Sequence, residues 1–73
     1  MSRLIRMDRS GHATVAEWKV GDQASVEAAV KAFNAQLAEG YFAVVGDEDR
    51  AEHVRELPLE APLVILRRPI VGG

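Results

Sequence analysis

The side chains that most often perform catalysis or bind metals are few in this sequence and lie far apart. Its two histidines, His12 and His53, have no other candidate ligand at the spacing of a metal site. Neither Ser10 nor Ser25 lies in the sequence context of a hydrolase nucleophile. The absence of cysteine excludes thiolate zinc sites and a cysteine nucleophile. We therefore expect no enzymatic activity, no cofactor and no metal site.

The two glycines at the end of the sequence, Gly72 and Gly73, are a candidate of another kind. Glycine has no Cβ and adopts extended and positive-φ conformations without strain, so a glycine pair can lie close to the backbone of another protein. Pro69 lacks an N–H and has a fixed φ, which would stop a preceding strand and stiffen the start of a tail. Glycines also occur in frayed chain ends that have no function. We predict that the tail, rather than an internal pocket, is the functional part.

Length and composition favour one globular domain spanning residues 1–73, with a tail over residues 67–73. Hydrophobic residues make up 48% of the 73 residues and charged residues 27%, as in ordinary globular chains. A domain of this size buries only about 60% of the surface that its unfolded chain exposes, so a deep catalytic cleft would be hard to build. The net charge of −2, with mixed signs, offers no basic face for nucleic acid. No signal peptide or membrane span is evident, so we expect a cytoplasmic monomer with protein partners and no membrane partner.

Hydrophobic periodicity predicts the elements that would position this tail. The predicted strands cover residues 3–9, 13–20, 41–45, 52–57 and 63–66, and the predicted helix covers residues 25–39. The first two strands form a hairpin around Ser10 and Gly11. Residues 63–66 are apolar on both faces, which indicates a central strand that can lie beside the first. Prolines bracket the weak strand at 52–57 and favour an edge position for it.

The helix has the clearest pattern in the sequence. Its apolar residues recur at spacings of three and four, and they are Val26, Ala29, Val30, Phe33 and Leu37. Asp22 or Ser25 can cap its start, and Gly40 can end it in the left-handed conformation. In the strand before it, Ala16, Trp18 and Val20 share one face, which we predict to be the inner one.

This order of elements, together with residues 63–73, resembles the ubiquitin-like β-grasp family. The likeness spans the whole chain, and its most specific part is a hydrophobic strand followed by Arg67-Arg68 and then Gly72-Gly73. In this sequence Pro69-Ile70-Val71 separates the arginines from the glycines. That ending is more similar to the sulfur carrier of molybdopterin synthesis than to ubiquitin.

The resemblance implies an α+β β-grasp fold: a β-hairpin, one helix packed on a four- to five-stranded mixed sheet, and a flexible C-terminal tail. It also implies a partner, an activating enzyme that uses ATP and magnesium to adenylate the carboxylate of Gly73, with Gly72 providing the close approach. The residues that would contact such a partner are Arg67, Arg68, Pro69, Ile70 and Val71. The sequence leaves open whether the chain is a protein modifier or a sulfur carrier. The alternative is a non-catalytic interaction or assembly module that uses its sheet surface or an edge strand.

Overall fold

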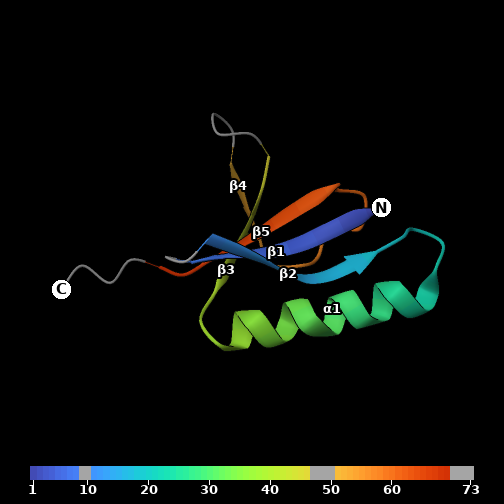
Figure 1. The fold of residues 1–73 in the computed structure, drawn as a ribbon, viewed down its shortest axis with the longest axis horizontal. Helices are drawn as coiled ribbons and strands as arrows, with labels where there is room; N and C mark the ends of the chain where they lie inside the picture. The colour runs from blue at the N-terminus through green and yellow to red at the C-terminus, as the bar shows by residue number, and fades with distance from the viewer. Residues whose placement is uncertain (9–10, 47–50, 70–73) are drawn as a thin grey trace.

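One helix and five strands are present in the residues that the structure describes, 1–8, 11–46 and 51–69 (Figure 1). In this computed structural model the elements are β1 (Ser2–Asp8), β2 (Gly11–Trp18), α1 (Gln23–Ala38), β3 (Phe42–Val45), β4 (Glu52–Val54) and β5 (Leu63–Arg67). The predicted α+β class and the predicted order of elements are confirmed. The largest differences are that β4 ends three residues earlier than predicted, that α1 begins two residues earlier, and that β2 begins and ends two residues earlier.

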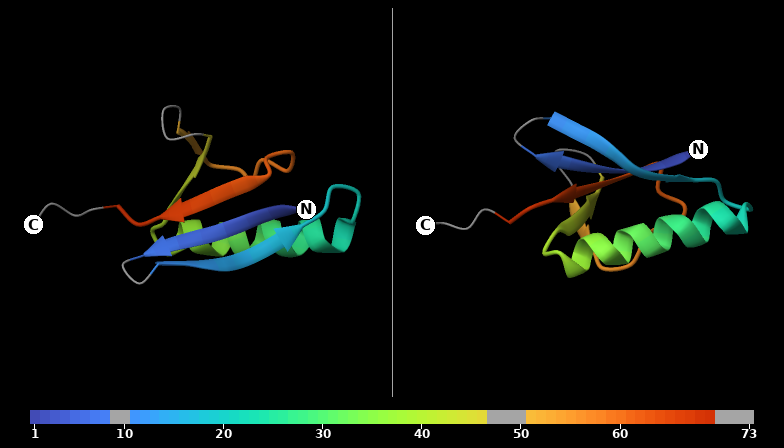
Figure 2. Two further views of the ribbon diagram at one scale, coloured as in Figure 1. Left: turned by 45° about the horizontal axis from the view of Figure 1, so that its top comes forward. Right: turned by 60° about the horizontal axis from the view of Figure 1, so that its bottom comes forward.

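The five strands form one mixed sheet in the order β2-β1-β5-β3-β4. β1 and β2 pair as the predicted antiparallel hairpin, whereas β5 runs parallel to β1 and antiparallel to β3. The helix α1 connects β2 to β3 and lies across one face of the sheet, which the right-hand view of Figure 2 shows most clearly. The predictions that the last strand is central and lies beside the first are therefore confirmed. Below, the face toward α1 is called the inner face and the opposite face the outer face.

The start of α1 is stabilised by Asp22, the first of the two predicted caps. Its side-chain carboxylate accepts a hydrogen bond from the backbone N–H of Ser25 at 3.4 Å, and its carbonyl accepts one from the N–H of Val26 at 3.1 Å. Ser25 has a different role, because its hydroxyl donates to the carbonyl of Asp22 and accepts from the N–H of Lys19. The end of the helix is also as predicted, since Gly40 adopts a φ of +103°.

We expect the substitution Asp22→Ala to lower the free energy of unfolding by about 1 kcal/mol, because the N–H of Ser25 loses its acceptor at the helix start. Thermal unfolding followed by far-UV circular dichroism measures the change. Asp22→Ser should keep most of the stability, since serine also caps helices. Asn34→Ala on the exposed face of α1 is the control and should change stability by less than about 0.5 kcal/mol. An Asp22→Ala variant as stable as the unaltered chain would contradict the capping role.

The core lies between α1 and the inner face of the sheet. Its fully buried residues come from the hairpin, the helix, β3 and β5, and they are Leu4, Trp18, Ala29, Phe33, Ala43, Val64 and Leu66. Trp18 is buried as predicted, but Val20 is 62% exposed and the prediction that it faces the core is wrong. The reason is that β2 ends at Trp18, and the chain then turns through a hydrogen bond from the N–H of Asp22 to the carbonyl of Lys19.

The segment between β4 and β5 packs against the core instead of extending the edge strand. β4 is at the sheet edge, as predicted, but covers only Glu52–Val54. Leu57 and Leu59, which follow it, pack against the buried cluster. The indole N–H of Trp18 donates to the carbonyl of Leu59 at 3.0 Å, and this bond joins residues 41 positions apart. The segment therefore closes one end of the core.

Candidate functional site

The predicted site residues begin where the last strand ends. β5 ends at Arg67, which pairs with Phe42 of β3, and Arg68 and Pro69 follow it outside the sheet. The side chains of Arg67, Arg68 and Pro69 are exposed. The other predicted site residues, Ile70, Val71, Gly72 and Gly73, lie outside the described residues. The structure thus places the root of the tail at the end of a central strand.

Two arginines, one in β1 and one directly after β5, contact one aromatic ring at this end of the sheet. The guanidinium carbon of Arg68 lies 5.5 Å from the centroid of the Tyr41 ring, and that of Arg6 lies 5.7 Å from the same centroid. Both distances are within the range of a cation–π interaction. Arg6, Tyr41 and Arg68 are called the arginine–tyrosine cluster below. The cluster therefore lies where the chain leaves β5 and the tail begins.

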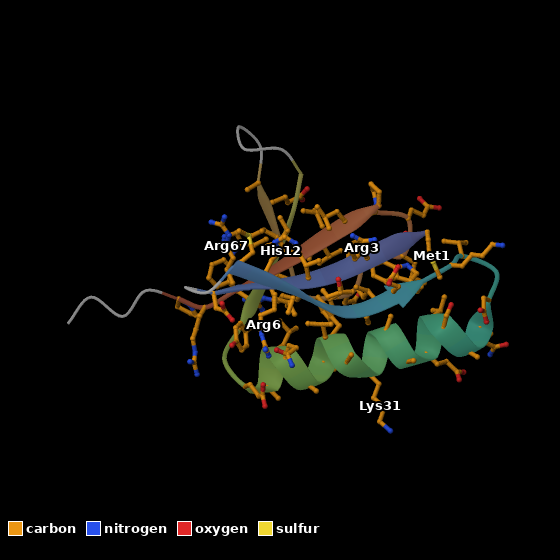
Figure 3. All side chains as sticks on the ribbon, in the orientation of Figure 1. Met1, Arg3, Arg6, His12, Lys31 and Arg67 are labelled. Carbon is orange, nitrogen blue, oxygen red and sulfur yellow. The ribbon has the colours of Figure 1, made fainter. Side chains whose placement is uncertain are left out.

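Backbone pairing brings the members of this cluster together. Arg6 is opposite Leu66 in the parallel pair of β1 with β5, so it reaches the sheet end from which Arg68 emerges. Tyr41 follows the helix stop, and its N–H donates to the carbonyl of Gln36 at 3.1 Å. Figure 3 shows Arg6 on the side of the sheet that faces α1, whereas Arg67 points to the other side. Arg67 therefore does not belong to the cluster, although it is the neighbour of Arg68.

The sequence reasoning missed Arg6 as a site residue. Arg6 alternates with apolar residues in β1 and looks like an ordinary polar strand position. Only the parallel register of β1 with β5 indicates that it lies near the tail root. A signal was nevertheless present, because a first strand predicted to lie beside the last one must bring its late residues close to residues 66–68.

The outer face of the sheet has a second feature, a shallow hollow between β3, β4 and β5. Its volume is about 460 Å³, and it is lined by Phe42, Val44, Gly46, Ala51, His53, Ile65 and Arg67. The rings of Phe42 and His53 stack in parallel, with centroids 4.9 Å apart and an interplanar angle of 5°. Apolar side chains thus form the floor, while an arginine and a histidine are at the rim.

The remaining candidates are not brought together by the fold. His12 is on β2 and His53 on β4, which are the two opposite edge strands of the sheet. In residues 1–8, 11–46 and 51–69, no three histidine or acidic side chains lie close enough to hold a metal ion. Ser25 belongs to the helix start, and Ser10 is outside the described residues. Over the same ranges, no helical segment has the length and hydropathy that a bilayer crossing requires.

In comparisons with known proteins, no family model, no curated protein and no solved structure matches the chain.

Proposed function

We propose that the chain is a ubiquitin-like carrier with a β-grasp fold, and that a partner enzyme activates its C-terminal carboxylate. The observation that carries this proposal is the position of β5. It is a central strand, parallel to β1, and the sequence after it ends in Gly72-Gly73. A tail that begins at the end of a central strand has a firmly held root. A tail that begins on a short edge strand such as β4 would not.

The chemistry of activation needs no catalytic side chain from this protein. A carboxylate oxygen of Gly73 attacks the α-phosphorus of ATP and displaces pyrophosphate, which gives an acyl-adenylate. A sulfur nucleophile then attacks the glycyl carbonyl carbon and releases AMP. If the nucleophile is a thiol of the partner, the product is a thioester, and if it is hydrosulfide, the product is a thiocarboxylate. The chain contributes a carboxylate on residues without side chains, attached to a folded domain that the partner can bind.

Incubation with ATP, magnesium and a candidate activating enzyme tests the proposal directly. Mass spectrometry of the intact chain should show a species heavier by one adenylyl group. After addition of a sulfur donor, it should show replacement of one oxygen by sulfur if the chain is a sulfur carrier. A protein modifier should instead form a thioester that thiols cleave. If no activating enzyme from the same cell forms any of these products, the proposal is wrong.

The hollow on the outer face favours a second candidate function, a non-catalytic interaction module. The stacked rings of Phe42 and His53 offer apolar contact area for a partner side chain. The half-buried side chain of Ile65 adds to this area. Such a module would bind its partner with or without residues 72 and 73.

The substitution His53→Asp separates the two functions. If the chain is an interaction module, His53→Asp should reduce partner capture at least about tenfold, because it removes the ring that stacks on Phe42 and adds a charge at an apolar contact. Pulldown with immobilised variants and quantitative mass spectrometry of the captured proteins measures this. His12→Asp is the matched control, since His12 is also an exposed histidine in an edge strand. A capture that needs residues 72 and 73 and tolerates His53→Asp would exclude the module.

A further inference from the structure

Three of the four large apolar side chains that are exposed in the described residues lie at one end of the sheet. Met1 is 85% exposed, Val20 is 62% exposed and Leu63 is 41% exposed. The strand register brings these residues together, because β1 begins beside the end of β2 and beside the start of β5. We call them the apolar end patch. Exposed apolar side chains that gather on one surface mark an interaction site more often than scattered ones do.

The apolar end patch lies at the end of the sheet opposite the tail. Because β5 runs parallel to β1, the two strands start at one end, and Arg67, after which the tail begins, is at the other. Figure 3 shows Met1 and Arg67 at these opposite ends. The fourth exposed apolar side chain, Met7, belongs to the far end of β1 and is not part of the patch. A molecule bound to the patch therefore leaves the C-terminal tail accessible.

Charged side chains of opposite sign are at the two ends of the apolar end patch. In the order of the strands, the patch extends from Val20 after β2, across Met1 before β1, to Leu63 at the start of β5. Lys19 precedes Val20, and Glu60 lies in the segment that leads into β5, and both are exposed. In the described part of the chain, no ion pair joins Lys19 or Glu60 to another side chain. The patch thus has a positive end and a negative end.

We propose that two copies of the chain form a dimer through the apolar end patch. In a two-fold symmetric contact the same surface faces itself. The arrangement that reverses the patch end to end places Lys19 of each copy toward Glu60 of the other, so the attraction occurs twice. The arrangement that does not reverse it would bring like charges together, so the charges select the first. One copy therefore supplies both the apolar surface and the charges that its counterpart needs, and the dimer does not depend on activation of the tail.

Sedimentation equilibrium of the full 73-residue chain, from micromolar to millimolar concentration, tests the dimer. Three apolar side chains from each copy make a small interface, so we expect weak association and a monomer at low concentration. The weight-average mass should rise from 8.0 kDa, the mass of one chain, toward twice that value and not beyond it, because a two-fold contact is closed. A mass that stays at that of one chain at every concentration, or that grows past two chains, would overturn the proposal.

The substitution Val20→Gln tests the apolar contact. It should raise the dissociation constant of the dimer about tenfold, because each copy loses an apolar side chain from the interface. Val20 lies beyond the end of β2, so the variant should keep the unfolding midpoint, measured at micromolar concentration. Met7→Gln is the matched control, since it changes an exposed apolar side chain at the other end of β1. A dimer that tolerates Val20→Gln, or that Met7→Gln weakens equally, does not form through the patch.

Charge exchange tests the arrangement of the two copies. Lys19→Glu and Glu60→Lys should each raise the dissociation constant about tenfold, because each replaces two attractive contacts with two repulsive ones. The double variant restores attraction with the signs exchanged, and its dissociation constant should return to within about threefold of that of the unaltered chain. Lys31→Glu is the matched control, since it changes the net charge equally on the exposed face of α1 and should leave the dimer unchanged. If the double variant associates no better than the single variants, the proposed dimer is wrong.

Discussion

The substitution Trp18→Ala is expected to reduce the free energy of unfolding by about 3–5 kcal/mol, the usual cost of deleting a buried aromatic side chain. Trp18 is fully buried and is the largest side chain of the core. A domain of 73 residues has a total stability of about 4–11 kcal/mol, because stability averages about 0.05–0.15 kcal/mol per residue. This one change therefore removes at least about a quarter of the stability.

Two contributions of Trp18 can be separated by a second variant. Trp18→Phe keeps an aromatic ring in the core but loses the indole donor, so the carbonyl of Leu59 loses its hydrogen bond. We expect this variant to lose about 1–3 kcal/mol, because a partly buried acceptor is left without its donor. Because the bond holds the segment between β4 and β5, amide hydrogen exchange in Leu57 and Leu59 should also become faster in Trp18→Phe.

Urea unfolding followed by far-UV circular dichroism measures both variants. Tryptophan fluorescence is not suitable, since Trp18 is the one tryptophan in the sequence. Val20→Ala is the control, because Val20 is 62% exposed two residues further on and should change stability by less than about 0.5 kcal/mol. Truncation of a core side chain usually costs more than about 1 kcal/mol. If the free energy of unfolding of Trp18→Ala differed from that of the unaltered chain by less than this, Trp18 would not be the anchor of the core.

Features that depend on local sequence were predictable. The helix has its apolar spacing, its cap at Asp22 and its stop at Gly40 within one continuous segment, and all three are confirmed. The central position of β5 followed from its apolar residues on both faces, since Val64 and Leu66 are buried in the core and Ile65 is half-buried on the outer face. Such features need no knowledge of how distant segments pair.

Features that depend on tertiary contacts were not predictable in the same way. No local pattern indicates that Leu59 accepts a hydrogen bond from Trp18, because the two residues are 41 positions apart. The exposure of Val20 depends on where β2 ends, and alternation alone continues the strand past that point. The arginine–tyrosine cluster requires the register of a parallel pair, which places Arg6 opposite Leu66. The role of Gly72 and Gly73 was predicted from the sequence, and it stays a prediction.

Deletion of Gly72 and Gly73 is expected to abolish adenylate formation and to leave the unfolding midpoint unchanged. Each extended residue spans at most about 3.3–3.6 Å, so the deletion withdraws the terminal carboxylate by about 7 Å. A misplacement of even about 1 Å can reduce a reaction rate by about a hundredfold, so a shift this large should leave no measurable product. The fold should not respond, because every buried core residue within the described ranges 1–8, 11–46 and 51–69 precedes Arg67. If the deletion lowers the unfolding midpoint, the two glycines are structural and the carrier proposal loses its basis.

A variant that carries Gly72→Ala and Gly73→Ala together separates the effect of tail length on activation from the effect of side-chain bulk in the tail. It keeps the carboxylate at the same distance from Pro69 but adds two methyl groups, which would clash wherever an enzyme backbone approaches closely. We expect kcat/KM for pyrophosphate exchange to fall at least about tenfold in this variant, which is a smaller loss than in the deletion. A tenfold fall requires the loss of only about 1.4 kcal/mol of transition-state stabilisation. Full activity of the alanine variant would show that only tail length matters. Full activity of the deletion would show that the reaction does not depend on Gly72 and Gly73.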